Sequence, residues 1–456
     1  MRTLFILPPS KFALREAAGI TALPLGLAYL ASVLEAEGQR VKIIDCPTLN
    51  YDMRSLEKEV KGFKPDVVGI TSTTSTIYDA YKVAELIKEI NSKAKVVIGG
   101  PHVSFTAKET LKECPFIDIV VRGEGEITTK ELMLHLEKGL SLEEVKGISF
   151  RKNGKIVETE DRPFIKNLDK LPFPAYHLLP MDKYKVGKHR FANTITSRGC
   201  PFSCIFCSSS ELCGRVWRAR SPENVVEELK VLKSEYDVSE VEFLDDTFTL
   251  NSRRVEKICD LMIKENLNLS WSASSRVNTI TQRLADIMKK AGCHTIYLGI
   301  ESGSQKILDL IQKGISVIQA EKAVQIVKRA GINALGSFII GVPGETTKSI
   351  KKTIRFAKRL NLNFVQFSIC TPYPGTRLYK IAKEKGLILT EDWSKYTILD
   401  PVMKTPGILG KELKKWLMRA YLSFYLRPKF LFEQIRRRDL FFFKKALKAG
   451  LNYVKG

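Results

Sequence analysis

Three cysteines lie within eight residues of one another, at Cys200, Cys204 and Cys207. Their C-x3-C-x2-C spacing supplies three thiolates, whereas a 4Fe-4S cluster that only carries electrons has four cysteine ligands. Three ligands would leave one iron open to a substrate or a second cofactor, and such a cluster can act as a catalyst. Gly199 and Pro201 favour a loop here, and a short loop can wrap around a cubane cluster.

Two other interpretations of these cysteines are open. A zinc site would need a fourth Cys or His at matching spacing, for which Cys213 is the nearest candidate. The three could also be buried thiols without a ligand role, although their density beside glycine and proline speaks against it. The other cysteines are scattered through mostly apolar stretches, which indicates free thiols in a reducing compartment.

The cysteine motif resembles the signature of the radical S-adenosylmethionine (SAM) enzymes. In that family the open iron binds the amino and carboxylate groups of SAM, and one electron then splits SAM to a 5′-deoxyadenosyl radical. The residue before the third cysteine is usually aromatic, and Phe206 stands there in this chain. The resemblance implies a 4Fe-4S cluster on Cys200, Cys204 and Cys207, with SAM as a cofactor.

Residues 191–390 must position this loop. Strands are predicted at 193–197, 240–244, 269–273, 295–300, 334–340 and 364–369, and each is followed by a helical stretch. Six such βα units favour a partial parallel (βα)6 barrel. Right-handed crossovers would place the carboxyl end of every strand on one rim, together with the cysteine loop.

Polar residues follow several of these strands and match the chemical groups of SAM. By resemblance to the family, Asp245 or Asp246 would bind the ammonium group and Arg276 the carboxylate. Glu301 and its neighbour would bind the ribose or the ammonium. The family's usual glycine-glycine-glutamate sequence is replaced here by two aspartates. The resemblance implies these SAM contacts: Phe206, Asp245, Asp246, Arg276, Glu301, Ser302, Ile340, Gly341 and Val342.

Residues 1–150 predict a second α/β unit. Apolar runs that fit strands alternate with amphipathic helical stretches such as 25–37 and 78–90. Short apolar strands between helices indicate a parallel sheet that is covered on both faces. This order resembles a flavodoxin-like doubly wound domain, which binds ligands at the carboxyl ends of its strands.

Hydroxyl groups and glycines follow three of the expected strands, at 71–76, 99–102 and 122–126. They suit a phosphate and a sugar, although each loop alone also fits helix capping and turns. Together with Pro24–Leu30, these loops resemble the cobalamin (B12)-binding domain that precedes many radical SAM enzymes. The implied cobalamin contacts are Ser72, Thr73, Thr74, Gly99, Gly100, His102, Gly123, Glu124 and Gly125.

The lower ligand of the cobalt stays open. The chain lacks the D-x-H-x-x-G sequence of the better-known cobalamin proteins, and the radical SAM branch commonly lacks it too. His102 is a candidate contact with the cofactor. A capping or structural role is the alternative for that residue.

The chain is therefore expected to be an α/β protein with four parts. These are a cobalamin-binding Rossmann-like domain at 1–150, a linker at 151–190 with a hairpin at Gly154, the barrel at 191–390 and a basic helical region at 391–456. No segment fits a signal peptide or a transmembrane helix, so a cytoplasmic protein is expected.

The last region carries much of the net charge of +23, because residues 402–456 hold 14 Lys and Arg against 3 acidic residues. An apolar stripe runs along 413–424 with helical spacing. Two interpretations remain: residues 411–456 could lie on an anionic membrane, or the stripe could cap the barrel. Nucleic acid is disfavoured, because no RNA-binding module is recognisable.

The paired resemblances imply a cobalamin-dependent radical SAM enzyme that activates a substrate C–H bond, with methyl transfer from methylcobalamin as the leading reaction. Ring formation or oxidation of a tetrapyrrole or lipid is the alternative, as in the anaerobic magnesium-protoporphyrin IX monomethyl ester cyclases. A tRNA methylthiotransferase would need three N-terminal cysteines, and residues 1–190 hold only Cys46 and Cys114. A non-enzymatic cofactor carrier would not need an open iron.

The expected partners follow from this chemistry. They are a small-molecule or lipid substrate and an electron donor such as flavodoxin or ferredoxin. The substrate, the choice between methylation and cyclisation, the donor and the oligomeric state are left open by the sequence.

Overall fold

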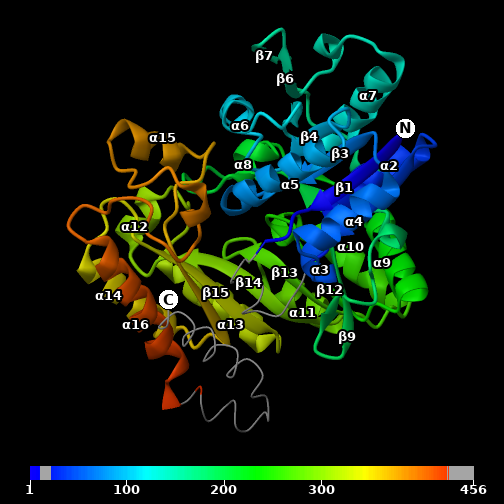
Figure 1. Cartoon of the computed structure of the whole chain (residues 1–456). Helices are drawn as coiled ribbons and strands as arrows, with labels where there is room; N and C mark the ends of the chain where they lie inside the picture. The colour runs from blue at the N-terminus through cyan, green and yellow to red at the C-terminus, as the bar shows by residue number, and fades with distance from the viewer. Residues whose placement is uncertain (11–21, 429, 431–456) are drawn as a thin grey trace.

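A sheet of seven strands forms the N-terminal part of the molecule (Figure 1). The computed structural model describes residues 1–10, 22–428 and 430. The strand order is β2-β1-β3-β4-β5-β6-β7, and the first five strands run parallel. This is the flavodoxin-like order expected from the sequence. The parallel strands are β1 (Arg2–Leu7), β2 (Arg40–Asp45), β3 (Val67–Thr71), β4 (Lys95–Gly99) and β5 (Ile119–Val121).

Helices cover both faces of this sheet, because alternate strand residues point to opposite sides. In β1, Phe5 belongs to one buried cluster, while Leu4 and Ile6 belong to the other. The first cluster includes residues of α2 and α7, and the second includes residues of α4, α5 and α6. These helices are α2 (Leu25–Ala36), α4 (Met53–Phe63), α5 (Ile77–Ile90), α6 (Ala107–Glu113) and α7 (Gly125–Lys138).

An antiparallel hairpin completes the first sheet. It consists of β6 (Ile148–Lys152) and β7 (Lys155–Glu158), and Asn153 and Gly154 form its turn with positive φ angles of 51° and 75°. The hairpin expected at Gly154 is therefore present. It extends the N-terminal sheet beyond β5.

The second sheet has the order β16-β15-β14-β13-β12-β9-β8, and β8 (Lys185–Val186) pairs antiparallel with β9 at one edge. The parallel strands are β9 (His189–Thr194), β12 (Glu240–Phe243), β13 (Ser270–Arg276), β14 (Cys293–Glu301), β15 (Asn333–Ile340) and β16 (Phe364–Ile369). Helices follow them: α9 (Pro222–Tyr236), α10 (Ser252–Lys264), α11 (Gln282–Lys290), α12 (Gln305–Leu310), α13 (Val317–Arg329), α14 (Thr347–Arg359) and α15 (Arg377–Glu384). The six βα units of a partial barrel are confirmed.

Residues 391–409 do not form regular helix, which corrects the expectation that the chain is helical from 391 onward. Between 391 and 409 the chain forms the short turn η6 (Trp393–Lys395) and isolated bridges such as that between Ile388 and Met403. Regular helix begins at Gly410 with α16 (Gly410–Tyr425). Residues 429 and 431–456 of this expected helical region lie outside the described residues.

The apolar stripe of α16 packs on the outside of the barrel beside α14 (Figure 1). Leu413, Leu417 and Phe424 are each no more than 2% exposed. The hydroxyls of Tyr421 and Tyr425 each bond backbone groups of β16, at distances of 2.9–3.1 Å. This geometry matches the interpretation in which the stripe caps the barrel. No helix in the described part of the chain is long and apolar enough to cross a membrane.

The carboxyl edge of the first sheet faces the rim of the second. The ring of Phe105, after β4, lies against Gly375, after β16. Trp393 of η6 packs against His102, also after β4, with ring centroids 5.1 Å apart. The ends of two separate sheets are thereby brought to one region of the molecule.

Candidate active site

The cysteine loop begins from a small ribbon at the rim of the barrel. Strand β10 (Ser197–Arg198) pairs antiparallel with β11 (Arg218–Ala219), and the loop lies between them in sequence. Gly199 has φ +86°, and a side chain there would collide with the backbone oxygen of Val216. The N–H of Cys200 donates to Gly214 O at 3.1 Å. Strand β9 ends at Thr194, earlier than expected, and the ribbon follows it.

The three thiols are partly exposed and free of disulfides. Burial raises the pKa of the Cys207 thiol, so a bound cation would favour its thiolate. Within the described residues, no three His, Cys, Asp or Glu side chains converge as they would around a single metal ion. A zinc site needs that convergence, whereas a cubane binds each thiolate to a different iron. The assignment of the three thiols to a 4Fe-4S cluster stays a prediction from the sequence.

Arg276 lies directly beside the cysteine loop. It ends β13, its guanidinium lies 3.6 Å from the centroid of the Phe202 ring, and Nη1 is 3.4 Å from Cys204 Sγ. Its other terminal nitrogen donates to Lys313 O. A fixed positive charge is thus held next to a cysteine of the motif, where it can attract a thiolate or a carboxylate.

Glu301 and Lys313 form a buried ion pair close to this arginine. Nζ of Lys313 is 2.6 Å from Glu301 Oε1, and both side chains are 8% exposed. The same Nζ lies 5.9 Å from the centroid of the Phe206 ring. Glu301 has a φ of 64°, a conformation that is unusual for a residue other than glycine. No sequence pattern pointed to Lys313, because its partner lies on a different element.

The adjacent aspartates Asp245 and Asp246 have different surroundings. Asp245 is buried and accepts bonds from Thr196 N at 2.7 Å, Thr196 Oγ1 at 2.6 Å and Ser197 Oγ at 2.5 Å. Asp246 is exposed at the rim, yet enough protein surrounds it to raise the pKa of its carboxyl, with the Ser209 hydroxyl opposing the shift. Asp245 therefore holds the start of the cysteine loop, and Asp246 is the aspartate that faces open space.

A third buried carboxylate, Glu345, shapes the loop after β15. Glu345 Oε2 accepts the N–H groups of Gly341 at 2.7 Å and Val342 at 3.4 Å. Burial raises the pKa of Glu345 to about 7, while these N–H groups oppose the shift. Gly341 has φ +84°, which favours glycine. Glu345 was not among the expected site residues, although it ends the same glycine-rich loop.

Ser302 is turned into the protein. It is fully buried, its hydroxyl lies 2.9 Å from Thr353 Oγ1, and it accepts the N–H of Ser304 at 3.1 Å. These contacts stabilise the turn after β14. The family resemblance assigned the Ser302 hydroxyl to SAM. In the structure this hydroxyl bonds protein groups instead.

At the edge of the N-terminal sheet, the loops after β3 and β4 touch. Ser72 Oγ is buried and has no hydrogen-bond partner among the described residues. A side chain at Gly100 would come within 2.5 Å of Ser72 O, so only glycine allows this approach. Thr73 caps the short helix η1 (Thr74–Thr76). A buried hydroxyl without a partner beside a glycine fits a site for a polar ligand.

His102 points toward protein groups. Its Nδ1 lies 3.2 Å from Thr74 Oγ1, and its ring packs edge-on against Trp393. Burial lowers the pKa of His102 to about 4, so the imidazole is neutral near pH 7. These contacts match the structural role that the sequence left open.

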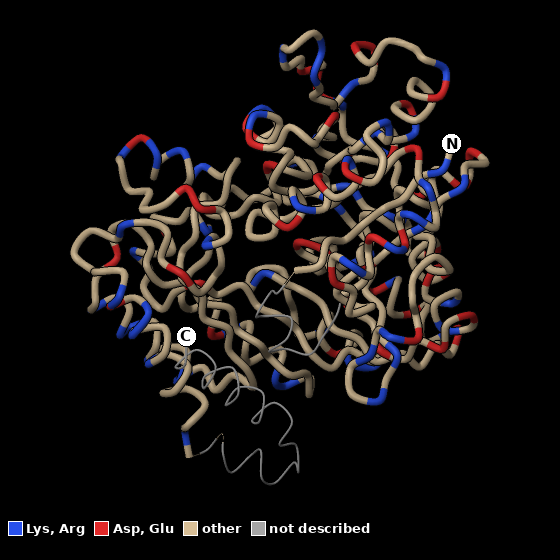
Figure 2. The backbone as a smooth tube through the Cα atoms, viewed as in Figure 1, with Lys and Arg blue, Asp and Glu red and all other residues tan. Residues whose placement is uncertain are grey.

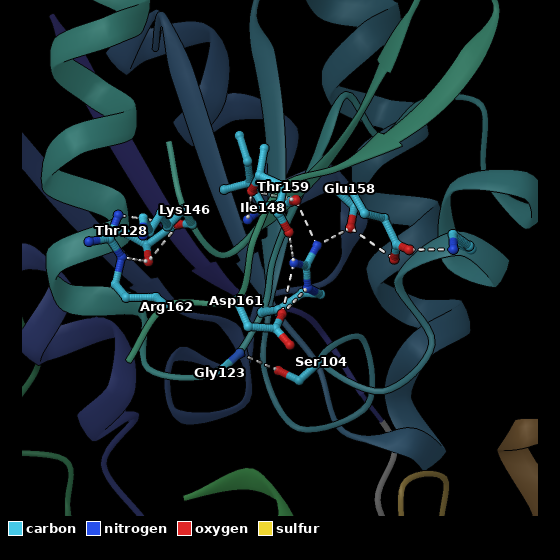
Figure 3. Close-up of polar contacts among 12 residues, drawn as sticks. Ser104, Gly123, Thr128, Lys146, Ile148, Glu158, Thr159, Asp161 and Arg162 are labelled. Carbon is cyan, nitrogen blue, oxygen red and sulfur yellow. Dashed lines mark hydrogen bonds and ion pairs between the residues drawn. The ribbon is translucent and has the colours of Figure 1, made fainter. Parts of the chain in front are cut away.

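The loop after β5 makes mainly protein contacts. Arg122 bonds Ile148 O, Ser149 Oγ, Thr159 O and Asp161, and so holds the β6–β7 hairpin. The N–H of Gly123 donates to Ser104 Oγ at 3.0 Å, as Figure 3 shows. Glu124 pairs with two arginines of the barrel domain. A Cβ on Gly125 would lie 3.1 Å from Leu30.

Comparison with known proteins matches both parts of this arrangement. Residues 194–357 match the model of the radical SAM superfamily, and residues 13–133 match that of the B12 binding domain. An uncharacterized methyltransferase of Pyrococcus horikoshii is 50% identical over 99% of this chain and 98% of its own length. The anaerobic magnesium-protoporphyrin IX monomethyl ester cyclase of Rubrivivax gelatinosus is 32% identical over 94% of this chain and 78% of that protein.

The chain belongs to the cobalamin-binding radical SAM enzymes. Solved structures share its fold at low identity. The cobalamin-dependent SAM radical enzyme OxsB covers 99% of this chain, with 72% of its own length aligned, a TM-score of 0.77 and 20% identity. The radical SAM methyltransferase TsrM of Kitasatospora setae covers 85%, with 76% of its own length aligned, a TM-score of 0.71 and 17% identity. As a member of this family, the enzyme uses a 4Fe-4S cluster, SAM and cobalamin.

Proposed function

We propose that this radical SAM enzyme transfers a methyl group to an unactivated carbon of a small-molecule or lipid substrate. One observation carries the proposal: the edge with Ser72 and Gly100 faces the rim that bears Cys200, Cys204 and Cys207. When bound, the three cofactors supply a carbon-centred radical and a methyl group. A substrate between the two edges would lie within reach of both.

The barrel residues have separate roles in this proposal. Cys200, Cys204 and Cys207 hold the cluster, and Asp245 fixes the loop that carries them. Arg276 and Asp246 bind the charged end of SAM, because their charges match its carboxylate and ammonium groups and both lie beside the cysteine loop.

The remaining SAM contacts are placed around the sugar and the base. Phe206 and the backbone of Ile340, Gly341 and Val342 contact the adenine, with Glu345 fixing that loop. Glu301 contacts the ribose while Lys313 neutralises it. Ser302 supports the turn that carries Glu301.

For cobalamin we propose that Ser72, Thr73, Gly99 and Gly100 line the site, since Ser72 offers a free hydroxyl and the glycines allow close approach. Thr74 and His102 support that edge from behind through their mutual contact. Gly123 and Gly125 shape the loop after β5, and Glu124 acts through the barrel domain.

Cyclisation or oxidation is the second candidate reaction. The relative from Rubrivivax gelatinosus is a cyclase that aligns with 94% of this chain. The same radical step would begin either reaction, so the two differ in what happens to the methyl group.

The test uses the full-length enzyme, purified without oxygen and reconstituted with iron, sulfide and hydroxocobalamin. SAM with a deuterated methyl group and a reductant are added, together with an extract of the cells that make the protein. We expect 5′-deoxyadenosine and a product that has gained the deuterated methyl group. Formation of 5′-deoxyadenosine with a product that lacks the label would favour cyclisation instead. Absence of bound cobalamin would refute methyl transfer from that cofactor.

We further propose a cytoplasmic enzyme that receives electrons from a flavodoxin or ferredoxin. All nine cysteines are free thiols, which suits a reducing compartment. Reduction by purified flavodoxin, followed as 5′-deoxyadenosine formation, tests the donor. Formation only with a chemical reductant would count against it.

Contact with an anionic membrane surface is proposed for a different face from the apolar stripe, because that stripe is buried against the barrel. Helix α14 carries basic residues and no acidic residue, and Figure 2 shows this basic side of the barrel. Beside α16 it forms a groove of about 340 Å³ lined by Lys351, Ile354, Arg355, Trp416, Arg419 and Ser423. Trp416 lies within 5.7 Å of Lys351 Nζ, a combination that suits lipid headgroups.

Sedimentation with phosphatidylglycerol vesicles tests this face. K351Q/R355Q should reduce binding about thirtyfold, because each of the two basic residues contributes about 1 kcal/mol at such a surface. The matched control is K61Q, which removes an exposed lysine of α4. Equal loss of binding in both variants would indicate nonspecific attraction by the net charge.

A further inference from the structure

Four charged side chains join the cysteine loop to the N-terminal domain. Glu124 and Glu126 follow β5 in the first domain, and Arg198 and Arg218 come from the ribbon β10–β11 around the loop. Glu124 Oε1 is 3.1 Å from Arg198 Nη1 and 2.9 Å from Arg218 Nη1, and Glu126 Oε1 is 2.5 Å from Arg198 Nη2. The side chains are only 7–11% exposed.

The ribbon needs these carboxylates. Arg198 and Arg218 are direct partners across its antiparallel ladder, so their two positive charges lie side by side in a buried place. Glu124 lies between them and pairs with both. Without the carboxylates, two buried guanidinium groups would repel each other without compensation, which is strongly unfavourable.

Glu124, Glu126, Arg198 and Arg218 together form a clamp, and further contacts connect this clamp to the cysteine loop. Arg218 donates to Cys213 O at 2.8 Å and to Ile165 O at 2.7 Å, and Ile165 N donates to Glu124 Oε2 at 2.7 Å. Arg198 is adjacent to Gly199 and two residues from Cys200. The ring of Tyr29, on α2 of the first domain, lies 5.5 Å from the Arg198 guanidinium.

Other residues of the motif Arg122–Glu126 also hold neighbouring segments of the protein in place. Arg122 fastens the hairpin, and Gly123 bonds Ser104 in the neighbouring loop (Figure 3). The structure thus gives partners within the protein to every charged side chain of a motif that the sequence placed at a cofactor.

We infer that Glu124 and Glu126 are positioning residues, which set the place of the cluster-bearing loop from the N-terminal domain through Arg198 and Arg218. Because the same domain carries the edge assigned to cobalamin, the clamp fixes the relation between the two cofactor sites. This consequence rests on the proposed function, whereas the clamp itself rests on the contacts above.

Amide hydrogen exchange of the full-length, cofactor-free protein tests the clamp without any activity. In E124Q/E126Q, peptides within 196–218 should exchange at least tenfold faster, while peptides of α16 stay unchanged. E59Q is the matched control, since Glu59 of α4 pairs with Lys42 of β2 in the same domain. Unchanged exchange in 196–218, or an equal rise in α16, would overturn the clamp.

The double variant should still fold, because other contacts join the two domains. Leu23 N donates to Asn193 Oδ1 at 2.7 Å, and Tyr184 OH donates to Asp45 Oδ2 at 2.7 Å. If it does not fold, R218K serves as the milder variant, since it keeps the charge and loses the contacts to Ile165 and Cys213. It should raise exchange in 196–218 at least threefold, and a wild-type rate would overturn the clamp.

The reconstituted enzyme gives a second readout, again without the substrate. E124Q/E126Q should lower SAM-dependent methylation of reduced cobalamin at least tenfold. Equal rates in variant and wild type would contradict the coupling of the sites. A wild-type enzyme that binds no cobalamin would refute the proposed function, while the exchange experiment would still decide the clamp.

Discussion

The rim of the barrel and the edge of the N-terminal sheet differ in how they present polar groups. At the rim, the three cysteines form no disulfide and Asp246 is exposed, and the charges behind them, such as Asp245 and the pair Glu301–Lys313, already have partners. At the sheet edge, His102, Glu124 and Arg122 are all held by protein groups, and Ser72 is left with a free buried hydroxyl. The rim therefore offers thiol and carboxylate groups, whereas the sheet edge offers mainly backbone shape and one hydroxyl.

The largest effect is expected at the cysteine loop. Cys204→Ala should abolish cluster binding and 5′-deoxyadenosine formation, because one iron loses its ligand. Cobalamin binding should persist, since that edge lies in the other domain. Iron content, the visible spectrum and product analysis measure these outcomes, with C213A as the control that keeps the cluster. Residual SAM cleavage in C204A would contradict the assignment of the cluster to the cysteine loop.

The two adjacent aspartates provide a sharper comparison within the rim. Asp245→Ala should lower the free energy of unfolding by at least about 3 kcal/mol, because three donors lose a charged acceptor. Asp246→Ala should change it by less than about 0.5 kcal/mol, as for most exposed positions. Denaturant unfolding of the reduced protein measures both. SAM affinity should fall in D246A even though its stability does not. Equal destabilisation by the two variants would contradict the division of roles.

The raised pKa of Glu345 predicts that the stability of the protein depends on pH. Its pKa in the folded protein is about 7, above the ordinary value of 4.5. The folded state therefore binds more protons between these values, and stability should fall as the pH rises from 4.5 to 7, by up to about 3 kcal/mol. Glu345→Gln should remove this decline, since the amide oxygen can still accept the N–H groups of Gly341 and Val342. Denaturation midpoints at pH 5 and pH 8 provide the measurement, and parallel profiles in both proteins would contradict the expectation.

The smallest effect is expected at the sheet edge. Ser72→Ala should weaken cobalamin binding by a factor of about five to ten, the equivalent of one hydrogen bond. The stability of the cofactor-free protein should not fall, because the hydroxyl has no partner among the residues that the structure describes. Thr74→Ala is the opposite case: it removes the contact with His102 and should lower stability more than affinity. Spectroscopic titration and thermal unfolding separate the two. Loss of stability in S72A would show that the Ser72 hydroxyl stabilises the folded protein and is not held free for cobalamin.

Much of the fold could be predicted from the sequence. The apolar runs at 334–340 and 364–369 became β15 and β16 within a residue, since short buried strands carry a strong local pattern. The stretch 193–197 was less accurate: β9 ends at Thr194, because Thr196 and Ser197 bond Asp245 across the rim. Residues 391–409 were expected to be helical, yet they turn back onto the first domain, where Trp393 covers His102.

By itself, the sequence determined the cysteine motif, the two βα series and hence the family. Such features depend on spacing along the chain, which local geometry translates directly into loops, strands and helices. Only the tertiary structure decided which charges are partners: Lys313 for Glu301, Glu345 for the N–H groups after β15, and Arg198 and Arg218 for Glu124 and Glu126. The sequence does not distinguish a carboxylate that binds a ligand from one that neutralises an arginine some seventy or more residues away. The difference is set by burial and by distances in space, which no local pattern records.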